Sequence, residues 1–334
     1  NFYQTMKGLK SILFAAAALI TAPAVITSCD DWTEAEPEDF YTPPTPGYEN
    51  NLKDYYNSPH KVMFGWFGNW GGTLKKNSLM GLPDSIDYVG LWLVWGNVTP
   101  EQQADLDAFH ARGSKTVMSW TARNIGENLT PERYTPEEYW GFDETEESRI
   151  EAVKRYAQAI VDTCTKYRIG GYDLDMEATG TLMNFSQRNV VNEFLRYLRA
   201  EFDKQGKMLC VDIPGGSGWL GYYTLLDNDV IESLDYIMWQ TYELGHYGLN
   251  DFFSSVEGRN PAMFKETLSK SVVCATFERA IDKHYFNDHS TWQSSTGLPH
   301  AGQGAYHIEY DYAGNPDYPT VRAGIATQNP PIRN

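Results

Sequence analysis

Residues 170–178 read Gly-Gly-Tyr-Asp-Leu-Asp-Met-Glu-Ala, in which acidic and apolar side chains alternate. Successive side chains of a β-strand point to opposite faces, so Asp173, Asp175 and Glu177 share one face. With a rise of about 3.3 Å per residue, neighbouring acids in this row have Cα atoms roughly 6.6 Å apart. Like charges this close raise the pKa of at least one carboxyl group, and the row is expected to titrate as a coupled set that holds a proton near neutral pH. Such an arrangement is suited to general acid catalysis.

The flanking sequence predicts where this strand lies in the fold. A helix is expected at about 146–167 and another at about 184–205, which is the setting of a buried parallel strand. The alternative is an edge strand whose acids point into water. We favour the buried strand with a functional acidic row, because buried acids are costly unless they are used.

The same run resembles the active-site strand of glycoside hydrolase family 18, whose signature is D-G-x-D-x-D-x-E. Gly171, Asp173, Asp175 and Glu177 match the signature, and Glu177 occupies the position of the catalytic acid. Gly170 stands where the signature has its first Asp. Position 170 is out of phase with the acidic row, so a side chain there would not join that row. The departure therefore leaves the expected chemistry intact.

Seven other segments have the composition of strands, and helical or loop segments separate them. They are His60–Trp66, Ser85–Trp95, Lys115–Trp120, Lys207–Ile213, Leu234–Tyr242, Ser271–Phe277 and Gly304–Tyr310. Strands that alternate with such connections form parallel βαβ units, and eight units indicate a single-domain TIM (β/α)8 barrel of the α/β class. The family resemblance implies the same fold.

In a TIM barrel the active site lies at the C-terminal ends of the strands, so residues at predicted strand ends are candidates for substrate binding. Aromatic residues make up 14% of the chain. Trp and Tyr can stack on sugars, but they are also ordinary core residues. We expect one of the Trp residues to lie under a sugar. The candidates are Trp66, Trp95, Trp120, Asp212, Trp239, Glu278 and Glu309.

The predicted sixth strand distinguishes two branches of the family. Residues 238–243 read MWQTYE. Family 18 chitinases carry M-x-Y-D here, which would require Tyr at position 240. Gln240 and Tyr242 instead resemble the Q-x-Y arrangement of the endo-β-N-acetylglucosaminidase branch. The alternative is a buried polar pair that only satisfies local hydrogen bonds.

The resemblance implies retaining, substrate-assisted hydrolysis, in which the 2-acetamido group of the substrate is the nucleophile. Glu177 would protonate the leaving oxygen, and Asp175 would accept the acetamido N–H and stabilise the oxazolinium charge. Asp173 would tune Asp175 by sharing a proton. Tyr242, aided by Gln240, would position the acetamido carbonyl. No metal or organic cofactor is required.

The function implied is that of a mannosyl-glycoprotein endo-β-N-acetylglucosaminidase, which cleaves the GlcNAc-β1,4-GlcNAc chitobiose core of N-glycans. Its partners would be N-glycans or glycoproteins. One alternative is a non-catalytic surface glycan-binding protein on the same barrel, although such family members usually lose the acid and Glu177 is present. The other is a chitinase, which fits the acidic strand but not Gln240.

The N-terminal sequence predicts export and lipid anchoring. A basic start at Met6–Lys10 precedes the apolar stretch Ile12–Ala22, which is short for a membrane span and typical of a secretory signal peptide. The stretch ends at VITSC, residues 25–29, which resembles a bacterial lipobox with Cys29 as the lipidated residue; a plain secretory peptide is the alternative. Residues 30–58 are predicted to be a flexible tether, and its acidic start is similar to the surface-export signals of Bacteroidota lipoproteins. We therefore expect a catalytic barrel over 59–334, lipid-anchored at the outer membrane and cell surface of a Gram-negative bacterium.

Composition bounds the remaining classes of function. The 334 residues, 42% of them hydrophobic, are enough for a sizeable core. A net charge of −17 argues against nucleic acid or an anionic membrane surface as a partner. The spacing of Cys164, Cys210 and Cys274 indicates neither a disulfide framework nor a zinc site. The polar segment 278–303, which includes Trp292, is expected to be a long loop over the active site or a disordered surface excursion.

Overall fold

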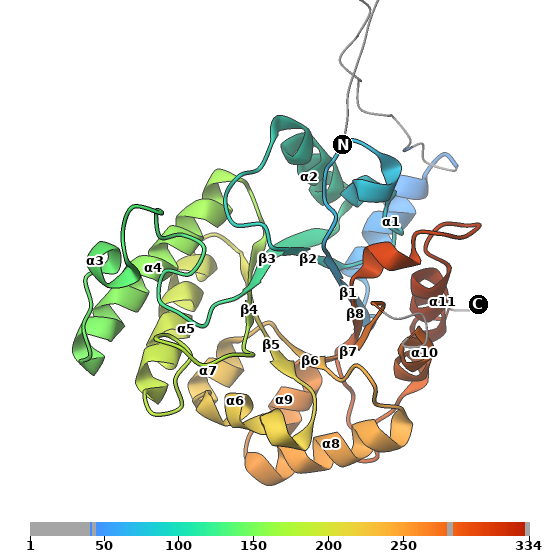
Figure 1. Cartoon of the computed structure of the whole chain (residues 1–334). Helices are drawn as coiled ribbons and strands as arrows, with labels where there is room; N and C mark the ends of the chain where they lie inside the picture. Colours follow the sequence, from blue (N-terminus) through green and yellow to red (C-terminus); the bar gives the residue numbers. More distant parts are fainter. Residues whose placement is uncertain (1–40, 42–44, 279–282, 331–334) are drawn as a thin grey trace, which may run out of the picture. The chain divides into compact units, whose positions relative to one another are not determined.

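Eight parallel strands close into a barrel in the computed structural model, which describes residues 41, 45–278 and 283–330 (Figure 1). Each strand pairs with its neighbours in chain order, and β1 pairs with β8. The strands are β1 (Val62–Phe67), β2 (Tyr88–Trp92), β3 (Lys115–Thr121), β4 (Gly171–Asp175), β5 (Met208–Pro214), β6 (Tyr236–Gln240), β7 (Ser271–Thr276) and β8 (Gly302–Tyr306). The predicted (β/α)8 barrel is confirmed.

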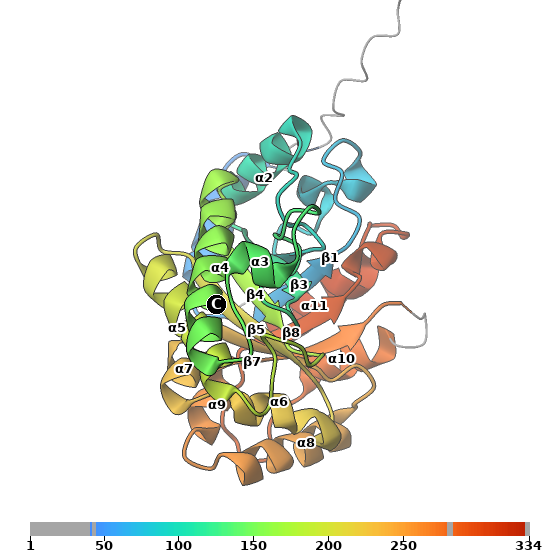
Figure 2. The same ribbon diagram turned by 60° about the vertical axis from the view of Figure 1, so that its left-hand side comes forward.

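Helices surround the barrel on its outside, and α4 and α5 lie side by side (Figures 1 and 2). The helices are α1 (Tyr48–Asn57), α2 (Pro100–Arg112), α3 (Pro136–Trp140), α4 (Glu146–Lys166), α5 (Arg188–Asp203), α6 (Leu220–Leu225), α7 (Asn228–Ser233), α8 (His246–Arg259), α9 (Phe264–Lys270), α10 (Lys283–Thr291) and α11 (Pro319–Gln328). Within the described ranges, no helix combines the length and the apolar character needed to cross a membrane.

The alternation of side chains along the strands separates two cores. Outward-facing residues such as Tyr172 and Leu174 pack against the helices. Inward-facing residues such as Phe64, Met238 and Cys274 fill the interior of the barrel. The strand β4 has the alternation expected from the sequence, because its acidic side chains point to the face opposite to that of its apolar side chains. The acidic row therefore points into the barrel.

The folded part of the chain begins earlier than the sequence indicated. Residues 48–57 fall in the predicted tether, yet they form helix α1. Leu52 is buried, and the Tyr56 hydroxyl lies 3.0 Å from the Ile86 carbonyl oxygen and 2.7 Å from Ser114 Oγ. The tether prediction is therefore wrong for residues 48–57. The predicted signal peptide, Cys29 and residues 30–40 lie outside the described residues and remain predictions.

Two strands end elsewhere than predicted. The strand β2 stops at Trp92, where Leu93 takes a left-handed conformation with φ of 61°. The strand β8 runs only from 302 to 306, and His307 after it has φ of 56°. A left-handed residue turns the chain out of the extended strand. Trp95 and Glu309 are consequently not strand-end residues, and their predicted positions are wrong.

The segment 278–303 is part of the scaffold. It contains α10, and Trp292 is buried with its ring stacked on Phe253 at 5.1 Å between centroids. Residues 279–282 lie outside the description. Over its described part, the segment is neither the expected long loop over the active site nor a disordered excursion, because it contains α10 and packs Trp292 into the core.

A buried carboxylate of α2 fixes the loop between β1 and β2. Asp105 of α2 accepts hydrogen bonds from the Trp70 indole at 2.8 Å, from the Leu79 backbone N–H at 2.7 Å and from that of Met80 at 3.2 Å, and it also pairs with Ser78. Backbone and side-chain donors of one loop thus converge on a single side chain. The loop follows the C-terminal end of β1, so this carboxylate shapes one edge of the barrel mouth.

We expect Asp105→Asn to lower the free energy of unfolding by about 2–3 kcal/mol, since a weaker acceptor replaces the carboxylate and an amide N–H₂ turns toward backbone donors. Asp107→Asn on the same helix is the matched control. Its carboxylate is 44% exposed and pairs with Arg168, so it should cost less than about 1 kcal/mol. Urea unfolding of both variants measures the difference. Equal, small losses would contradict the role of Asp105.

Candidate active site

A pocket of about 250 Å³ opens at the C-terminal ends of the strands, where active sites of TIM barrels lie. Its volume lies just below the range of roughly 300–1,000 Å³ that is usual for ligand sites. Every strand, or the residues directly after it, contributes to the lining. The lining residues are Trp66, Trp92, Thr121, Asp175, Glu177, Asp212, Gln240, Tyr242, Glu278 and Tyr306.

Asp173 is the innermost acid of the row and is fully buried. Its Oδ2 accepts hydrogen bonds from Trp66 Nε1 at 2.9 Å and from Ser119 Oγ at 2.6 Å. Burial raises the pKa of Asp173 to about 6, although the hydrogen bonds act in the opposite direction. This carboxyl group can therefore exchange a proton near neutral pH.

Asp175 lies one step nearer the mouth, and only 1% of its surface is exposed. The Thr121 hydroxyl donates to its Oδ2 at 2.6 Å. Burial, followed by the negative charge of Glu177, raises the pKa of Asp175 to about 8. Asp175 therefore holds a proton at neutral pH in the free protein.

Asp212 brings a further carboxyl group to the same place from β5. It stands directly opposite Asp175 in the β4–β5 register and is 1% exposed. Burial raises its pKa well above the usual range, and the charges of Asp175 and Asp173 add to the effect. The Asp212 carboxyl group also lies within hydrogen-bonding reach of both of these acids. A protonated Asp212 can donate to one of them at a time.

Gln240 joins the acids of the two strands from β6. Its Nε2 lies 2.8 Å from Glu177 Oε1, 2.5 Å from Asp212 Oδ1 and 3.4 Å from Asp175 Oδ1. An amide has two N–H donors, whereas a tyrosine at this position would have one O–H. Gln240 therefore binds two carboxyl groups at once without adding a positive charge that would draw the protons off.

Aromatic rings complete the lining. Tyr306 stacks on Tyr242 with centroids 6.2 Å apart and meets Trp92 edge-on at 5.5 Å. Burial, and next the charge of Asp212, raises the pKa of Tyr242, so its hydroxyl stays protonated and can donate. Trp92 and Tyr306 are pocket residues that the sequence pattern did not identify. Both are the last inward-facing residues of their strands, and correct strand ends would have identified them.

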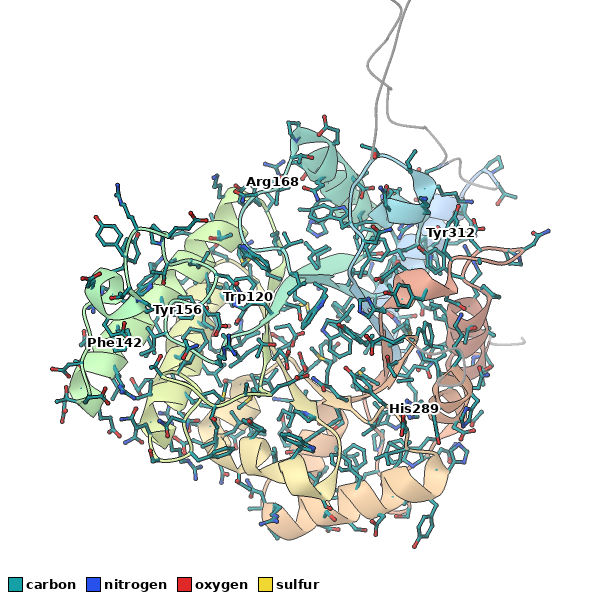
Figure 3. The ribbon with its side chains drawn as sticks, in the orientation of Figure 1. Trp120, Phe142, Tyr156, Arg168, His289 and Tyr312 are labelled. Atoms are coloured by element: carbon teal, nitrogen blue, oxygen red, sulfur yellow. The ribbon has the colours of Figure 1, made fainter. Side chains whose placement is uncertain are left out.

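Two of the predicted tryptophans lie outside the site. Trp120 and Trp239 are completely buried and face away from the barrel interior. The Trp120 indole N–H points to the Tyr156 hydroxyl of α4 at 3.3 Å (Figure 3), and that of Trp239 donates to Ser271 Oγ at 2.8 Å. On β3 and β6, Trp120 and Trp239 alternate with the side chains that point into the barrel, so they point outward. The prediction that they bind substrate is therefore wrong.

The other candidates occupy different places around the mouth. Trp66 lies inside the barrel with its indole N–H committed to Asp173, so it supports the acid row and borders the pocket. Glu278 lines the pocket. Glu309 accepts hydrogen bonds from the Gly68 N–H at 3.2 Å and from His307 at 2.6 Å, and it does not line the pocket.

Trp95 lines a separate groove that shares Trp92 with the pocket. The groove has a volume of about 340 Å³. It lies over the residues that follow β1 and β2. Its lining residues are Gly68, Trp70, Trp92, Leu93, Val94, Trp95, Asn97 and Gln102.

Gly170, where the family signature has Asp, stands directly before β4 and therefore at the opposite end of the strand from Glu177. A Cβ at this position would lie 2.5 Å from the Thr116 carbonyl oxygen. No side chain fits there without a shift of the backbone. The departure from the signature thus reflects close packing of β4 on β3, away from the pocket.

The buried acids make the fold sensitive to pH. The folded-state pKa of Asp212 is raised, so above about pH 4 the unfolded chain releases this proton while the folded protein keeps it, and stability falls as pH rises. We expect Asp212→Asn to raise the melting temperature more at pH 8 than at pH 5. Asp162→Asn, on the outer helix α4, is the control and should show no such difference. If Asp212→Asn changed the melting temperature equally at both pH values, the raised pKa of Asp212 would be contradicted.

Comparisons with known proteins agree with the geometry of the site. The profile described as glycoside hydrolase family 18, BT1044-like, matches residues 33–213, more than half of the chain. The solved structure of selenomethionine BT1044 with a Glu-to-Gln substitution is 30% identical, covers 89% of this chain and 96% of its own, and superposes with a TM-score of 0.73. No curated protein sequence matches.

Two more distant structures share the fold. An apo endo-β-N-acetylglucosaminidase from Cordyceps militaris is 20% identical, with 86% of this chain and 98% of that chain covered and a TM-score of 0.64. A family 18 chitinase from Pseudoalteromonas aurantia is 13% identical, with 80% and 99% covered and a TM-score of 0.57. The barrel, the acidic strand and the match over most of the chain lead to one assignment: the protein belongs to glycoside hydrolase family 18, in its BT1044-like group.

Proposed function

We propose that the protein is a mannosyl-glycoprotein endo-β-N-acetylglucosaminidase that cleaves the GlcNAc-β1,4-GlcNAc bond in the chitobiose core of N-glycans. The proposal rests on Gln240, because the chitinase pattern has a tyrosine at this position. The Gln240 amide donates hydrogen bonds to Glu177 and Asp212. A mutant of the Cordyceps militaris enzyme was solved with fucosyl-N-acetylglucosamine-Asn, the part of an N-glycan that such cleavage leaves on the protein. This complex supports the choice of substrate.

Glu177 acts as the general acid. It is exposed to the pocket, and Gln240 fixes its carboxyl group. Burial and the negative charge of Glu177 keep a proton on Asp175 at neutral pH. Transfer of that proton from Asp175 to Glu177 leaves Asp175 ionised. Glu177 then protonates the glycosidic oxygen as the bond to the anomeric carbon breaks.

The acetamido oxygen of the substrate is the nucleophile. It bonds to the anomeric carbon while the reducing-end GlcNAc leaves with the proton from Glu177, and the product is an oxazolinium. Ionised Asp175 accepts the acetamido N–H and offsets the positive charge. Tyr242 donates its hydroxyl to the acetamido oxygen. Water, deprotonated by Glu177, then opens the ring from the opposite face, so the configuration is retained.

Incubation with a high-mannose glycoprotein and, separately, with chitin oligomers tests the substrate class. Loss of the glycan mass with one GlcNAc left on the polypeptide supports the proposal. Cleavage of chitin oligomers alone would indicate a chitinase. Binding of the glycoprotein without any cleavage would indicate a non-catalytic glycan-binding protein.

Glu177→Gln should lower the rate of glycan release by roughly 10²–10⁴-fold or more, because the side chain keeps its shape and loses the proton to be donated. Affinity for the glycoprotein should remain. Mass spectrometry of the deglycosylated protein measures the rate, and calorimetric titration measures binding. Turnover close to that of the wild type would remove Glu177 from the role of acid.

Tyr242→Phe deletes one hydroxyl and leaves the ring stacked on Tyr306. The hydroxyl acts mainly when the acetamido oxygen is aligned for attack, so kcat should fall more than KM changes. Asp175→Asn should reduce kcat further, since it removes the charge that offsets the oxazolinium. Tyr236→Phe, at the opposite end of β6, is the control and should leave both constants unchanged. If Tyr242→Phe behaves like this control, the hydroxyl does not position the substrate.

A further inference from the structure

Three aromatic side chains form a continuous surface next to the pocket, which we call the aromatic platform. Trp219 and Phe185 are 51% and 50% exposed, and Tyr222 lies buried between them. The ring of Tyr222 is almost parallel to that of Trp219, with centroids 6.3 Å apart, and lies 5.0 Å from that of Phe185. None of the three belongs to the lining of the central pocket. Contiguous exposed apolar surface, unlike single exposed rings, is typical of an interaction site.

The backbone holds the platform firmly against the barrel. The Gly215 N–H donates to the Gln240 carbonyl at 3.1 Å, and a Cβ on Gly215 would lie 2.6 Å from that oxygen. Gly216 has φ of 141°, a conformation that favours glycine. Phe185 lies over Gly221, where a Cβ would approach its ring to 3.2 Å. The loop that carries Trp219 is therefore seated directly on the end of β6.

The platform is also connected to the acid. The Tyr222 hydroxyl donates to the backbone carbonyl of Glu177 at 2.7 Å. Phe185 comes from the segment that follows Glu177, between β4 and α5, and Trp219 comes from the segment between β5 and α6. The groove lined by Trp92 and Trp95 belongs instead to the β1 and β2 side of the mouth. The platform thus flanks the pocket on the side of the acid.

We propose that the aromatic platform binds the leaving-group half of the substrate, which is the GlcNAc that stays on asparagine together with the adjoining polypeptide. This inference rests on the proposed function. Asp175, Asp212 and Tyr242 line the pocket that receives the acetamido sugar. The acid donates its proton to the bond between that sugar and the leaving group, so the leaving group extends beyond Glu177, where the platform lies. Its rings offer flat apolar faces to a sugar ring and to peptide groups.

Contacts on the leaving-group side would contribute to the rate of bond cleavage, because binding energy from remote parts of a substrate helps to align the reacting centre. They cannot contribute when no leaving group is present. A sugar oxazoline with the same glycan is such a substrate, since water that Glu177 deprotonates opens its ring and no leaving group departs. Comparing the rates at which a variant hydrolyses a glycopeptide and the oxazoline therefore isolates the contribution of the platform.

Trp219→Ala should lower kcat/KM for an N-glycopeptide about tenfold or more, as expected for removal of an interfacial tryptophan. Hydrolysis of the matching sugar oxazoline should proceed at the wild-type rate. Phe185→Ala should show the same selective loss to a smaller extent, and Trp219→Phe should retain part of the activity. Tyr247→Ala removes a ring that is 85% exposed on α8 and serves as the control, with both activities unchanged.

Equal losses on both substrates, or no loss on either, would overturn the role of the platform while the proposed function stands. Failure of the wild-type protein to cleave the glycopeptide would overturn the proposed function itself, and the ligand assigned to the platform with it. Melting temperatures of the variants show whether they fold. Because Trp219 is half exposed, Trp219→Ala should melt within a few degrees of the wild type.

Discussion

Carboxyl groups from two neighbouring strands meet in a pocket whose lining holds no positive side chain among the residues that the structure describes, and this crowding governs the chemistry of the site. Asp173, Asp175 and Asp212 are almost completely buried. Buried like charges cannot all be ionised, so some of these groups keep their protons at neutral pH. The acids accept hydrogen bonds from neutral donors, namely the hydroxyls of Ser119 and Thr121 and the Trp66 indole. These donors stabilise the acids without adding a positive charge.

The barrel is what makes this crowding possible. Parallel register sets Asp212 beside Asp175, and the next pair of strands sets Gln240 beside Pro214. Gln240 can therefore reach both β4 and β5 from β6. The network of Gln240 and the buried acids keeps protons at defined positions. It lowers the stability of the folded protein, as is common at active sites. The proposed catalysis uses that stored proton when Glu177 donates to the leaving oxygen.

Strict two-residue alternation made the central features predictable. The inward direction of the acids of β4 and the presence of eight βα units could be predicted, because the folded protein keeps the repeating pattern of the sequence. The same alternation, applied to β3 and β6, would have placed Trp120 and Trp239 outside the barrel. Trp92 and Tyr306 were missed because left-handed Leu93 and His307 end their strands early, and neither residue type signals that conformation.

Features that depend on loop packing could not be read from the chain. Helix α1 has few apolar residues, and tyrosine hydroxyls bonded to backbone carbonyls hold it in place. The Asp212 position on β5 carries no signature of its own, and its meaning comes from the register with β4. The aromatic platform is assembled from two separate connections, so its exposure and its contact with Glu177 exist only in three dimensions.

The central claim is that the substrate's acetamido group, stabilised by ionised Asp175, attacks the anomeric carbon. The anomeric configuration of the oligosaccharide at the moment of its release tests this most directly. Proton NMR of the reaction, recorded before mutarotation, should show the β-anomer first. Initial appearance of the α-anomer would mean direct attack by water, and it would contradict the role assigned to the acid cluster.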